Sequence, residues 1–135
     1  AMNVLKGSCL CGEVTFSVEE RFKAFYLCHC AQCQKLTGSG FASNILTTPD
    51  NINWLTGAEH ITNYEHPSRA FSKAFCKLCG SGVPFINKSK TTLFIPAGSL
   101  TEKPSIVPTA KIFKAESPEW LKQGLNAKSY DGFPD

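Results

Sequence analysis

Three cysteines crowded into six residues constrain this chain more than any other feature. Cys28, Cys30 and Cys33 form a C-x-C-x-x-C triplet, and two further pairs flank it in the sequence, Cys9/Cys11 and Cys76/Cys79. Such close spacings suit a thiolate metal site better than disulfides, and seven cysteines cannot all pair within one chain. Structural zinc takes four protein ligands, whereas zinc that does chemistry takes three and leaves one position open. The cysteines are therefore expected to divide into four and three.

Length and charge limit the possible classes of protein. The chain has 135 residues with 42% apolar side chains, which predicts one domain over residues 1–135. A net charge of +3 with only 19% charged residues argues against nucleic acid and anionic membranes as partners. No apolar run approaches the roughly 20 residues that span a bilayer, and the opening residues lack signal-peptide character. We expect a protein of the reducing cytoplasm, where thiols stay available for metal.

Short stretches of alternating or β-branched residues predict a mainly β fold. The expected strands lie at 12–18, 23–28, 41–47, 51–55, 60–64, 69–75, 83–87 and 92–97. One helical turn is expected at 31–36, and a second helix with Ser117 as N-cap, Pro118 at its first position and Gly124 as its stop. Widely spaced prolines beyond Gly98 favour an extended segment wrapped over the body. Residues 123–135 are expected to form a loosely held tail.

The outer pairs form the expected set of four. Cys9, Cys11, Cys76 and Cys79 would make a closed, all-thiolate structural site. Because this site closes a long loop, and because structural zinc contributes on the order of 10 kcal/mol to folding, we expect it to be required for folding.

The triplet Cys28, Cys30 and Cys33 forms the expected set of three. A zinc ion held there would keep one position for a thiol or a carbonyl oxygen. Two alternatives remain open: His29, His60 or His66 could supply a fourth ligand and make the site structural, or the cysteines could act as a redox pair. We expect two zinc ions per chain. The second site is expected to be partly empty, and two of its cysteines could then oxidise to a disulfide.

Polar residues after the triplet are candidates for the mouth of a pocket. Lys35, Thr37 and Ser39 could hold the carboxylates of a peptide-like thiol, and backbone amides at Gly98 and Ser99 could face a ligand. No general base is identifiable from the sequence.

The motifs together resemble the glutathione-dependent formaldehyde-activating family, whose domain is shared with centromere protein V relatives. The resemblance rests on Gly7 to Val14, Cys28 to Ser39, Phe75 to Ser81 and Ala97 to Leu100, and Trp120 fits the family's ending. The recognisable part spans residues 7–122.

This resemblance implies a β-tent fold of antiparallel short-stranded sheets. It also implies that Cys9, Cys11, Cys76 and Cys79 hold a structural zinc, while Cys28, Cys30 and Cys33 hold a functional one. The implied activity is carbon-sulfur lyase chemistry, in which glutathione and formaldehyde condense to S-hydroxymethylglutathione. One departure is Lys111, which stands where the family often has histidine. It could pair with a substrate carboxylate or lie solvated on the surface.

The resulting hypothesis is an enzyme that reversibly adds a small-molecule thiol to formaldehyde or another small aldehyde. The main alternative is a non-catalytic zinc module for a protein or nucleic-acid partner, with a local basic patch from Lys73, Lys77, Lys88 and Lys90. A methionine-sulfoxide-reductase-like activity is a second alternative, and its reactive cysteine would have to come from the triplet. An open ligand position that responds to added thiol distinguishes the enzyme from the module.

Overall fold

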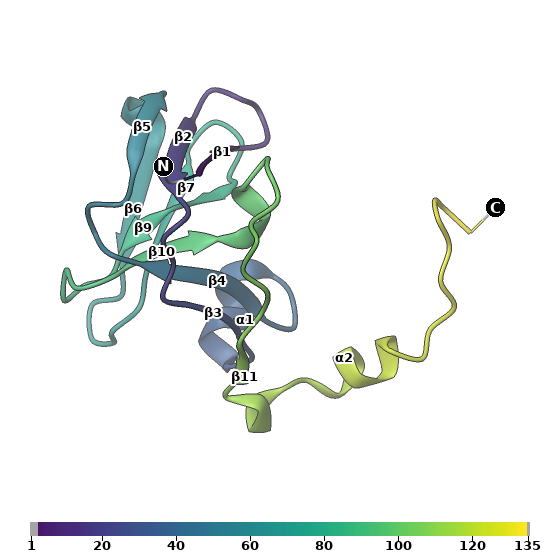
Figure 1. The fold of residues 1–135 in the computed structure, drawn as a ribbon. Helices are drawn as coiled ribbons and strands as arrows, with labels where there is room; N and C mark the ends of the chain where they lie inside the picture. Colours follow the sequence, from purple (N-terminus) through teal and green to yellow (C-terminus); the bar gives the residue numbers. More distant parts are fainter. Residues whose placement is uncertain (1–2, 135) are drawn as a thin grey trace.

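The computed structural model describes residues 3–134; residues 1, 2 and 135, at the ends of the expected domain and tail, lie outside the described residues. Its elements are β1 Val4–Ser8, β2 Thr15–Glu19, β3 Ala24–Cys28, α1 Ala31–Thr37, β4 Ala42–Thr47, β5 Asn53–Thr56, η1 Ala58–His60, β6 Ile61–Glu65, β7 Ser72–Cys76, β8 Gly82–Val83, β9 Phe85–Ile86, β10 Leu93–Pro96, η2 Ala97–Ser99, β11 Ala110–Ile112, η3 Lys114–Glu116 and α2 Glu119–Gly124 (Figure 1). The η elements are single 3₁₀ turns.

Three small sheets build the body. Their strand orders are β1-β2-β5, β11-β3-β4-β10-β9 and β6-β7-β8. All ladders are antiparallel except that of β11, which runs parallel to β3. The mainly β fold with two short helices is confirmed, and the parallel ladder is a feature that the strand pattern did not predict.

The main core fills the space between the first two sheets. Its buried members are large apolar side chains that alternate along the strands: Leu5, Phe16, Val18, Phe25, Ile45, Leu93 and Ile95. Two smaller clusters surround the cysteines, one built on Val14, Ala74 and Val83 and the other on Ala42. Complete burial of one such apolar side chain stabilises the fold by about 1.5–3 kcal/mol. The loops that carry the cysteines therefore pack against stable hydrophobic clusters.

Most expected segments overlap a strand, with informative differences at the ends. The segment 83–87 is divided, because Pro84 lies between β8 and β9. β1 was not expected, since Gly7 interrupts its pattern. A Cβ at Gly7 would lie 2.3 Å from the Phe16 ring and 2.6 Å from the Ser99 carbonyl oxygen, so only glycine allows this close approach.

The second helix begins later than expected. Pro118, and not Ser117, is the N-cap residue of α2, and no side chain caps that end. The Ser117 N–H instead donates to the Lys114 carbonyl and closes η3. The prediction of Ser117 as N-cap was therefore wrong, because the preceding 3₁₀ turn uses that residue.

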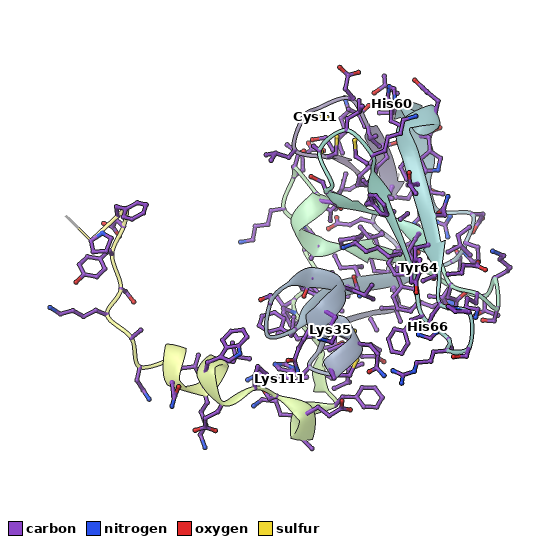
Figure 2. All side chains as sticks on the ribbon, turned by 180° about the vertical axis from the view of Figure 1, so that it is seen from behind. Cys11, Lys35, His60, Tyr64, His66 and Lys111 are labelled. Atoms are coloured by element: carbon purple, nitrogen blue, oxygen red, sulfur yellow. The ribbon has the colours of Figure 1, made fainter. Side chains whose placement is uncertain are left out.

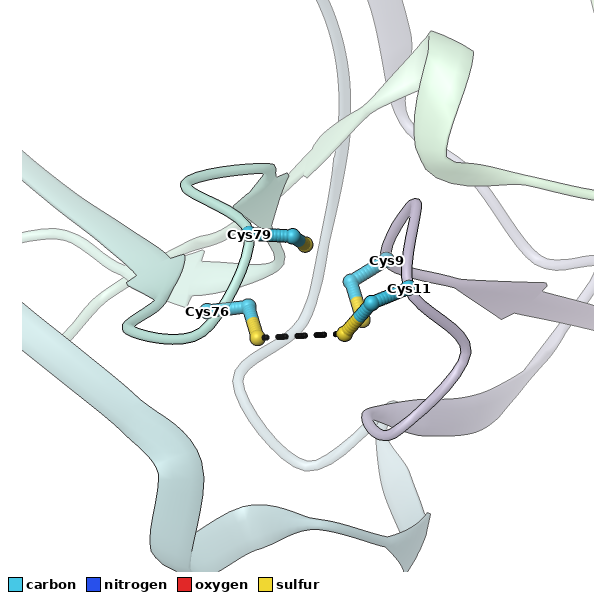
Figure 3. A group of neighbouring side chains, drawn as sticks. All are labelled: Cys9, Cys11, Cys76 and Cys79. Carbon is cyan, nitrogen blue, oxygen red and sulfur yellow. Dashed lines mark hydrogen bonds between the residues drawn. The ribbon is translucent and has the colours of Figure 1, made fainter.

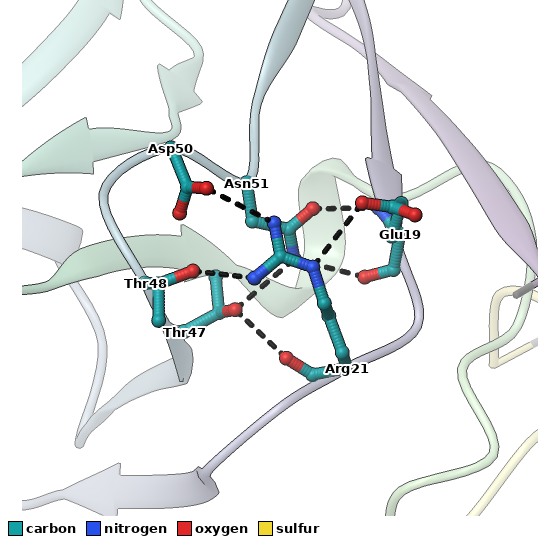
Figure 4. Close-up of polar contacts among 6 residues, drawn as sticks. All are labelled: Glu19, Arg21, Thr47, Thr48, Asp50 and Asn51. Atoms are coloured by element: carbon teal, nitrogen blue, oxygen red, sulfur yellow. Dashed lines mark hydrogen bonds and ion pairs between the residues drawn. The ribbon is translucent and has the colours of Figure 1, made fainter.

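A buried polar network closes the end of the main core (Figure 4). Asn51, only 2% exposed, accepts from the Glu19 N–H at 2.8 Å and donates to the Glu19 carbonyl at 2.9 Å and to Thr47 Oγ1 at 3.0 Å. Thr47 Oγ1 in turn donates to the Arg21 carbonyl at 2.9 Å. The network joins the end of β2 to the connection between β4 and β5, and its buried groups are paired, as stable burial of polar groups requires.

Candidate metal centres and the cavity between them

Four cysteines from distant parts of the chain meet at one end of the molecule. Cys9 and Cys11 lie in the turn after β1, Cys76 ends β7 and Cys79 lies in the turn that follows (Figure 3). All four Sγ atoms lie within 4.8 Å of one another; Cys9 and Cys11 are 3.5 Å apart, and Cys11 and Cys76 3.9 Å. A tetrahedral zinc with bonds of about 2.3 Å places its sulfurs about 3.8 Å apart, so this donor set fits zinc.

Backbone hydrogen bonds hold the two turns of this cluster. The Cys9 N–H donates to the Val14 carbonyl at 3.0 Å, and the Cys76 N–H donates to the Ser81 carbonyl at 2.9 Å. The Leu10 N–H donates to Ser81 Oγ at 2.9 Å and thereby joins one turn to the other. The cluster is therefore positioned by the fold as well as by any ion it holds.

Neighbouring groups set the acidity of Cys79 and Cys11 in this cluster. Hydrogen bonds from the Ser81 hydroxyl and from backbone N–H groups lower the pKa of Cys79 to about 5. The Glu13 backbone lowers the pKa of Cys11, but desolvation and the three neighbouring sulfurs outweigh it and raise the pKa to about 12. The Val14 N–H lies 3.3 Å from Cys9 Sγ and helps to stabilise a thiolate there. Donor groups thus support negative charge at this cluster.

The triplet lies where β3 ends and α1 begins, at the other end of the body. Cys28 ends β3, Cys30 is the N-cap of α1 and Cys33 lies in its first turn. The three Sγ atoms lie within 4.8 Å of one another. Cys30 is 4% exposed and Cys33 7%, and the Cys33 N–H points to Cys30 Sγ at 3.4 Å. Three close thiols are a soft donor set that suits zinc and lacks one of its usual four ligands.

Two of the three histidines use a ring nitrogen in contacts with backbone groups. His29 Nδ1 lies 3.0 Å from the Leu27 carbonyl oxygen, and its ring lies against Phe41 with centroids 5.1 Å apart. His66 Nδ1 accepts from the N–H groups of two residues in its own loop. His60 ends η1, at the opposite end of the molecule from Lys35 (Figure 2), and its Nδ1 is buried without a hydrogen-bond partner among the described residues. Among residues 3–134, the sulfur triplet gathers no histidine or carboxylate ligand atom.

The segment from β11 to Glu116 makes hydrogen bonds with the residues around the triplet, and we call it the clamp. β11 pairs with β3, and the His29 N–H donates to the Ile112 carbonyl at 2.9 Å. Glu116 then accepts from the Ala31 N–H at 3.0 Å, at the first turn of α1. Gln34 Nε2 donates to the carbonyls of His29 at 2.9 Å and Glu116 at 3.0 Å. Glu116 was not among the expected site residues, since nothing in its local sequence marks a contact 85 residues away.

Burial dominates the acidity of the triplet. Removal from water raises the pKa of Cys28, and it raises the pKa of Cys33, whose neighbours Cys28 and Cys30 raise it further. A cation bound by these sulfurs would stabilise their thiolate forms.

A cavity of about 820 Å³ runs between the two clusters. Cys33 lines it on one side and Cys9 on the other. Aromatic and apolar walls come from Phe41, Phe71, Val83, Phe85 and Phe94, and polar groups from Ser8, Ser43, Asn44, Ser81 and Asn87. Lys73 is the one charged side chain that lines it within the described part of the chain. Both clusters thus border a space large enough for a small organic ligand.

Some of the residues expected at the mouth of a pocket line this cavity, and others lie away from it. Thr37, Ser39, Gly98 and Ser99 line the cavity, and Thr37 Oγ1 donates to the Cys33 carbonyl at 2.8 Å. Lys35 instead borders a separate hollow beside Trp120. Lys111 is exposed on β11.

The sequence suggested a basic patch of Lys73, Lys77, Lys88 and Lys90. In the structure, three of these four ammonium groups contact backbone carbonyls or a carboxylate. Lys73 Nζ donates to the Leu36 carbonyl, and Lys88 Nζ donates to two carbonyls of the 66–69 loop. Lys90 lies 3.5 Å from a Glu65 carboxylate oxygen. The alternation of buried residues along β7 could have placed Lys73 on the opposite face of its strand, but not against a cavity.

Comparison with known proteins identifies the family. Residues 4–116 match the family described as glutathione-dependent formaldehyde-activating enzyme. The chain belongs to this family. A curated protein of Halomonas elongata named "Putative glutathione-dependent formaldehyde-activating enzyme" is 26% identical over 142 residues, covering 98% of this chain and 90% of that protein. Both clusters lie inside the family match, which ends at Glu116.

A solved structure supports the fold. The crystal structure of a Rhodobacter sphaeroides protein superposes with a TM-score of 0.62 at 23% identity, covering 79% of this chain and 99% of the other. No helix within residues 3–134 has both the length and the apolar character needed to cross a membrane.

Proposed function

We propose that the chain is a zinc-dependent enzyme of carbon-sulfur lyase type that reversibly adds a glutathione-like thiol to formaldehyde or another small aldehyde. The observation that carries this proposal is the sulfur triplet, whose Cys33 opens on the 820 Å³ cavity. Membership of the family supports glutathione and formaldehyde as the substrate pair.

Two zinc ions per chain are part of this proposal. Cys9, Cys11, Cys76 and Cys79 would hold the structural ion, and Cys28, Cys30 and Cys33 the functional one. When bound at the triplet, zinc supplies Lewis acidity that favours a thiolate and polarises a carbonyl group.

The reaction itself requires one new bond and one proton transfer. The thiol sulfur attacks the aldehyde carbon, the carbon-oxygen double bond becomes a single bond, and the thiol proton ends on that oxygen. Among the described residues that line the cavity, no carboxylate or imidazole is available as a base. Water is therefore the proposed proton carrier, while the hydroxyl and amide groups of Ser43 and Asn44 can orient the polar end of the adduct.

The walls of the cavity would position the two reactants and keep bulk water away from them. Phe41 and Phe71 lie beside the triplet and limit the access of bulk water. A cavity of about 820 Å³ falls within the roughly 300–1,000 Å³ typical of small-molecule sites, so a tripeptide-sized thiol fits. The chain thus supplies position and exclusion of water, which favours close approach of the two reactants.

Exchange NMR with ¹³C-formaldehyde and glutathione tests the proposal. The zinc-loaded protein is expected to accelerate exchange between free formaldehyde and its glutathione adduct in proportion to protein concentration. Cys33→Ser should remove the acceleration and keep the fold. Exchange at the uncatalysed rate with fully zinc-loaded protein would contradict the proposal and favour a non-catalytic zinc module.

A further inference from the structure

We infer that Lys73 anchors a carboxylate of the thiol substrate, so that the cavity selects acidic thiols. This inference rests on the proposed function, since it assumes that a thiol enters the cavity.

The side chain of Lys73 reaches from one wall of the cavity to the other. Its neighbours Ser72 and Ala74 are buried on one face of β7, which places Lys73 on the opposite face. An added Cβ at Gly82 would lie 3.8 Å from Lys73 Cε, and Nζ donates to the Leu36 carbonyl on α1. The ammonium group is therefore held at the end of the helix that carries Cys33.

The charge of Lys73 has no counterion in the described structure. No carboxylate of residues 3–134 forms an ion pair with its Nζ. An ammonium group has three N–H donors, and the Leu36 carbonyl takes one of them. Two donors remain for a ligand, in a cavity that no other lysine, arginine, histidine or carboxylate of the described residues lines. A half-buried cation in such surroundings gains most from an ionised acceptor.

Spacing along α1 separates Cys33 from the carbonyl that Lys73 binds. Leu36 follows Cys33 by three residues, which corresponds to a rise of about 4.5 Å along a helix. A thiol whose sulfur lies at the triplet therefore meets Lys73 with a carboxylate several bonds away. Glutathione, with two carboxylates in an extended chain, provides such a group; a simple alkyl thiol does not.

Calorimetric titration with glutathione and with its diethyl ester tests this assignment on the zinc-loaded protein. The wild type is expected to bind glutathione about tenfold or more tightly than the ester, the size of one charge-assisted hydrogen bond. Lys73→Met should weaken glutathione binding by about the same factor and leave ester binding within about twofold. Lys73→Arg should restore most of the preference. Lys23→Met, at an exposed lysine before β3, is the matched control and should change neither affinity.

The outcomes distinguish a Lys73 that binds the substrate carboxylate from a Lys73 that only connects β7 to α1. Equal weakening of glutathione and ester by Lys73→Met would overturn the inference, as would no weakening of either. If Lys73→Met fails to fold, the comparison of acid and ester on the wild type decides, and equal affinities would overturn it. Exchange NMR on the same samples tests the activity separately: Lys73-dependent binding without accelerated exchange would refute the proposed function and support the anchor.

Discussion

The two cysteine clusters use the same donor atom and differ in how the chain assembles them. The set of four joins turns that are 65 residues apart between Cys11 and Cys76, so it exists only once the sheets have formed. The set of three comes from one strand end and the first turn of one helix, within six residues. A site made by long-range contacts is coupled to the fold, whereas a locally made site can lose its ion while the fold persists.

The two clusters also differ in the hydrogen-bond donors that surround their sulfur atoms. In the set of four, the Val14 N–H donates to Cys9 Sγ and hydrogen bonding with Ser81 lowers the pKa of Cys79, and its four sulfurs supply all the ligands that a tetrahedral zinc needs. The triplet is buried, with fewer such donors and three sulfurs. Under the proposed function, the set of four would hold a permanent ion, and the triplet would hold an ion whose fourth ligand exchanges.

Replacing a cysteine in each cluster should give the largest contrast. We expect Cys76→Ser to yield an insoluble or molten product, because a structural ion is worth on the order of 10 kcal/mol and a domain is stable by roughly 5–15 kcal/mol. Cys33→Ser should fold and retain one zinc per chain. Near-UV circular dichroism and metal analysis measure both results. A folded Cys76→Ser protein with its full zinc content would break the contrast.

Acidification should separate the clusters next. Metal binds the deprotonated thiol, and burial raises the pKa of Cys28 and Cys33, so protons compete more effectively at the triplet. At the other cluster the pKa of Cys11 is also raised, to about 12, but hydrogen bonding with Ser81 lowers the pKa of Cys79 to about 5, so at least one thiolate persists there to lower pH. As pH falls, one zinc should therefore leave before any loss of fold. A chelating dye and circular dichroism follow the two events. Simultaneous release of both ions with unfolding would argue against independent sites.

The clamp on α1 should affect one cluster alone. Glu116→Ala removes the acceptor of the Ala31 N–H, and zinc affinity at the triplet is expected to fall by about tenfold, as for other groups that orient metal ligands. Glu102→Ala is the matched control, because Glu102 also accepts a backbone N–H, that of Lys6 at 2.7 Å, far from the triplet. Competition titration with a chelator measures both. Equal losses in the two variants would show that the clamp is not specific.

Lys111→Met should have the smallest effect. The side chain is exposed on β11 and does not line the cavity, so kcat/KM in the exchange assay is expected to stay within about twofold of the wild type. A tenfold loss would instead assign Lys111 to the carboxylate of the thiol and would weaken the case for Lys73.

Local patterns in the sequence predicted the parts of the molecule that local physics determines. The strands with alternating residues, the turn of α1 ended by Gly38 in a left-handed conformation, and the close approach of the three triplet cysteines all follow from neighbouring residues. β11, Glu116 and the position of Lys73 depend on contacts between distant segments. The sequence of β11, three residues between prolines, does not indicate that the strand pairs in parallel with β3. The residues next to Lys73 in the sequence likewise do not indicate whether its side chain faces a cavity or bulk water.

Cobalt substitution followed by thiol titration tests the division of the cysteines most directly. Cobalt that replaces zinc at both sites reports each thiolate environment through its visible absorption. Two ions per chain are expected, and glutathione should change the spectrum of the ion lost in Cys33→Ser while leaving the other unchanged. A single ion per chain, or two ions that are both indifferent to glutathione, would contradict an open triplet beside a closed set of four.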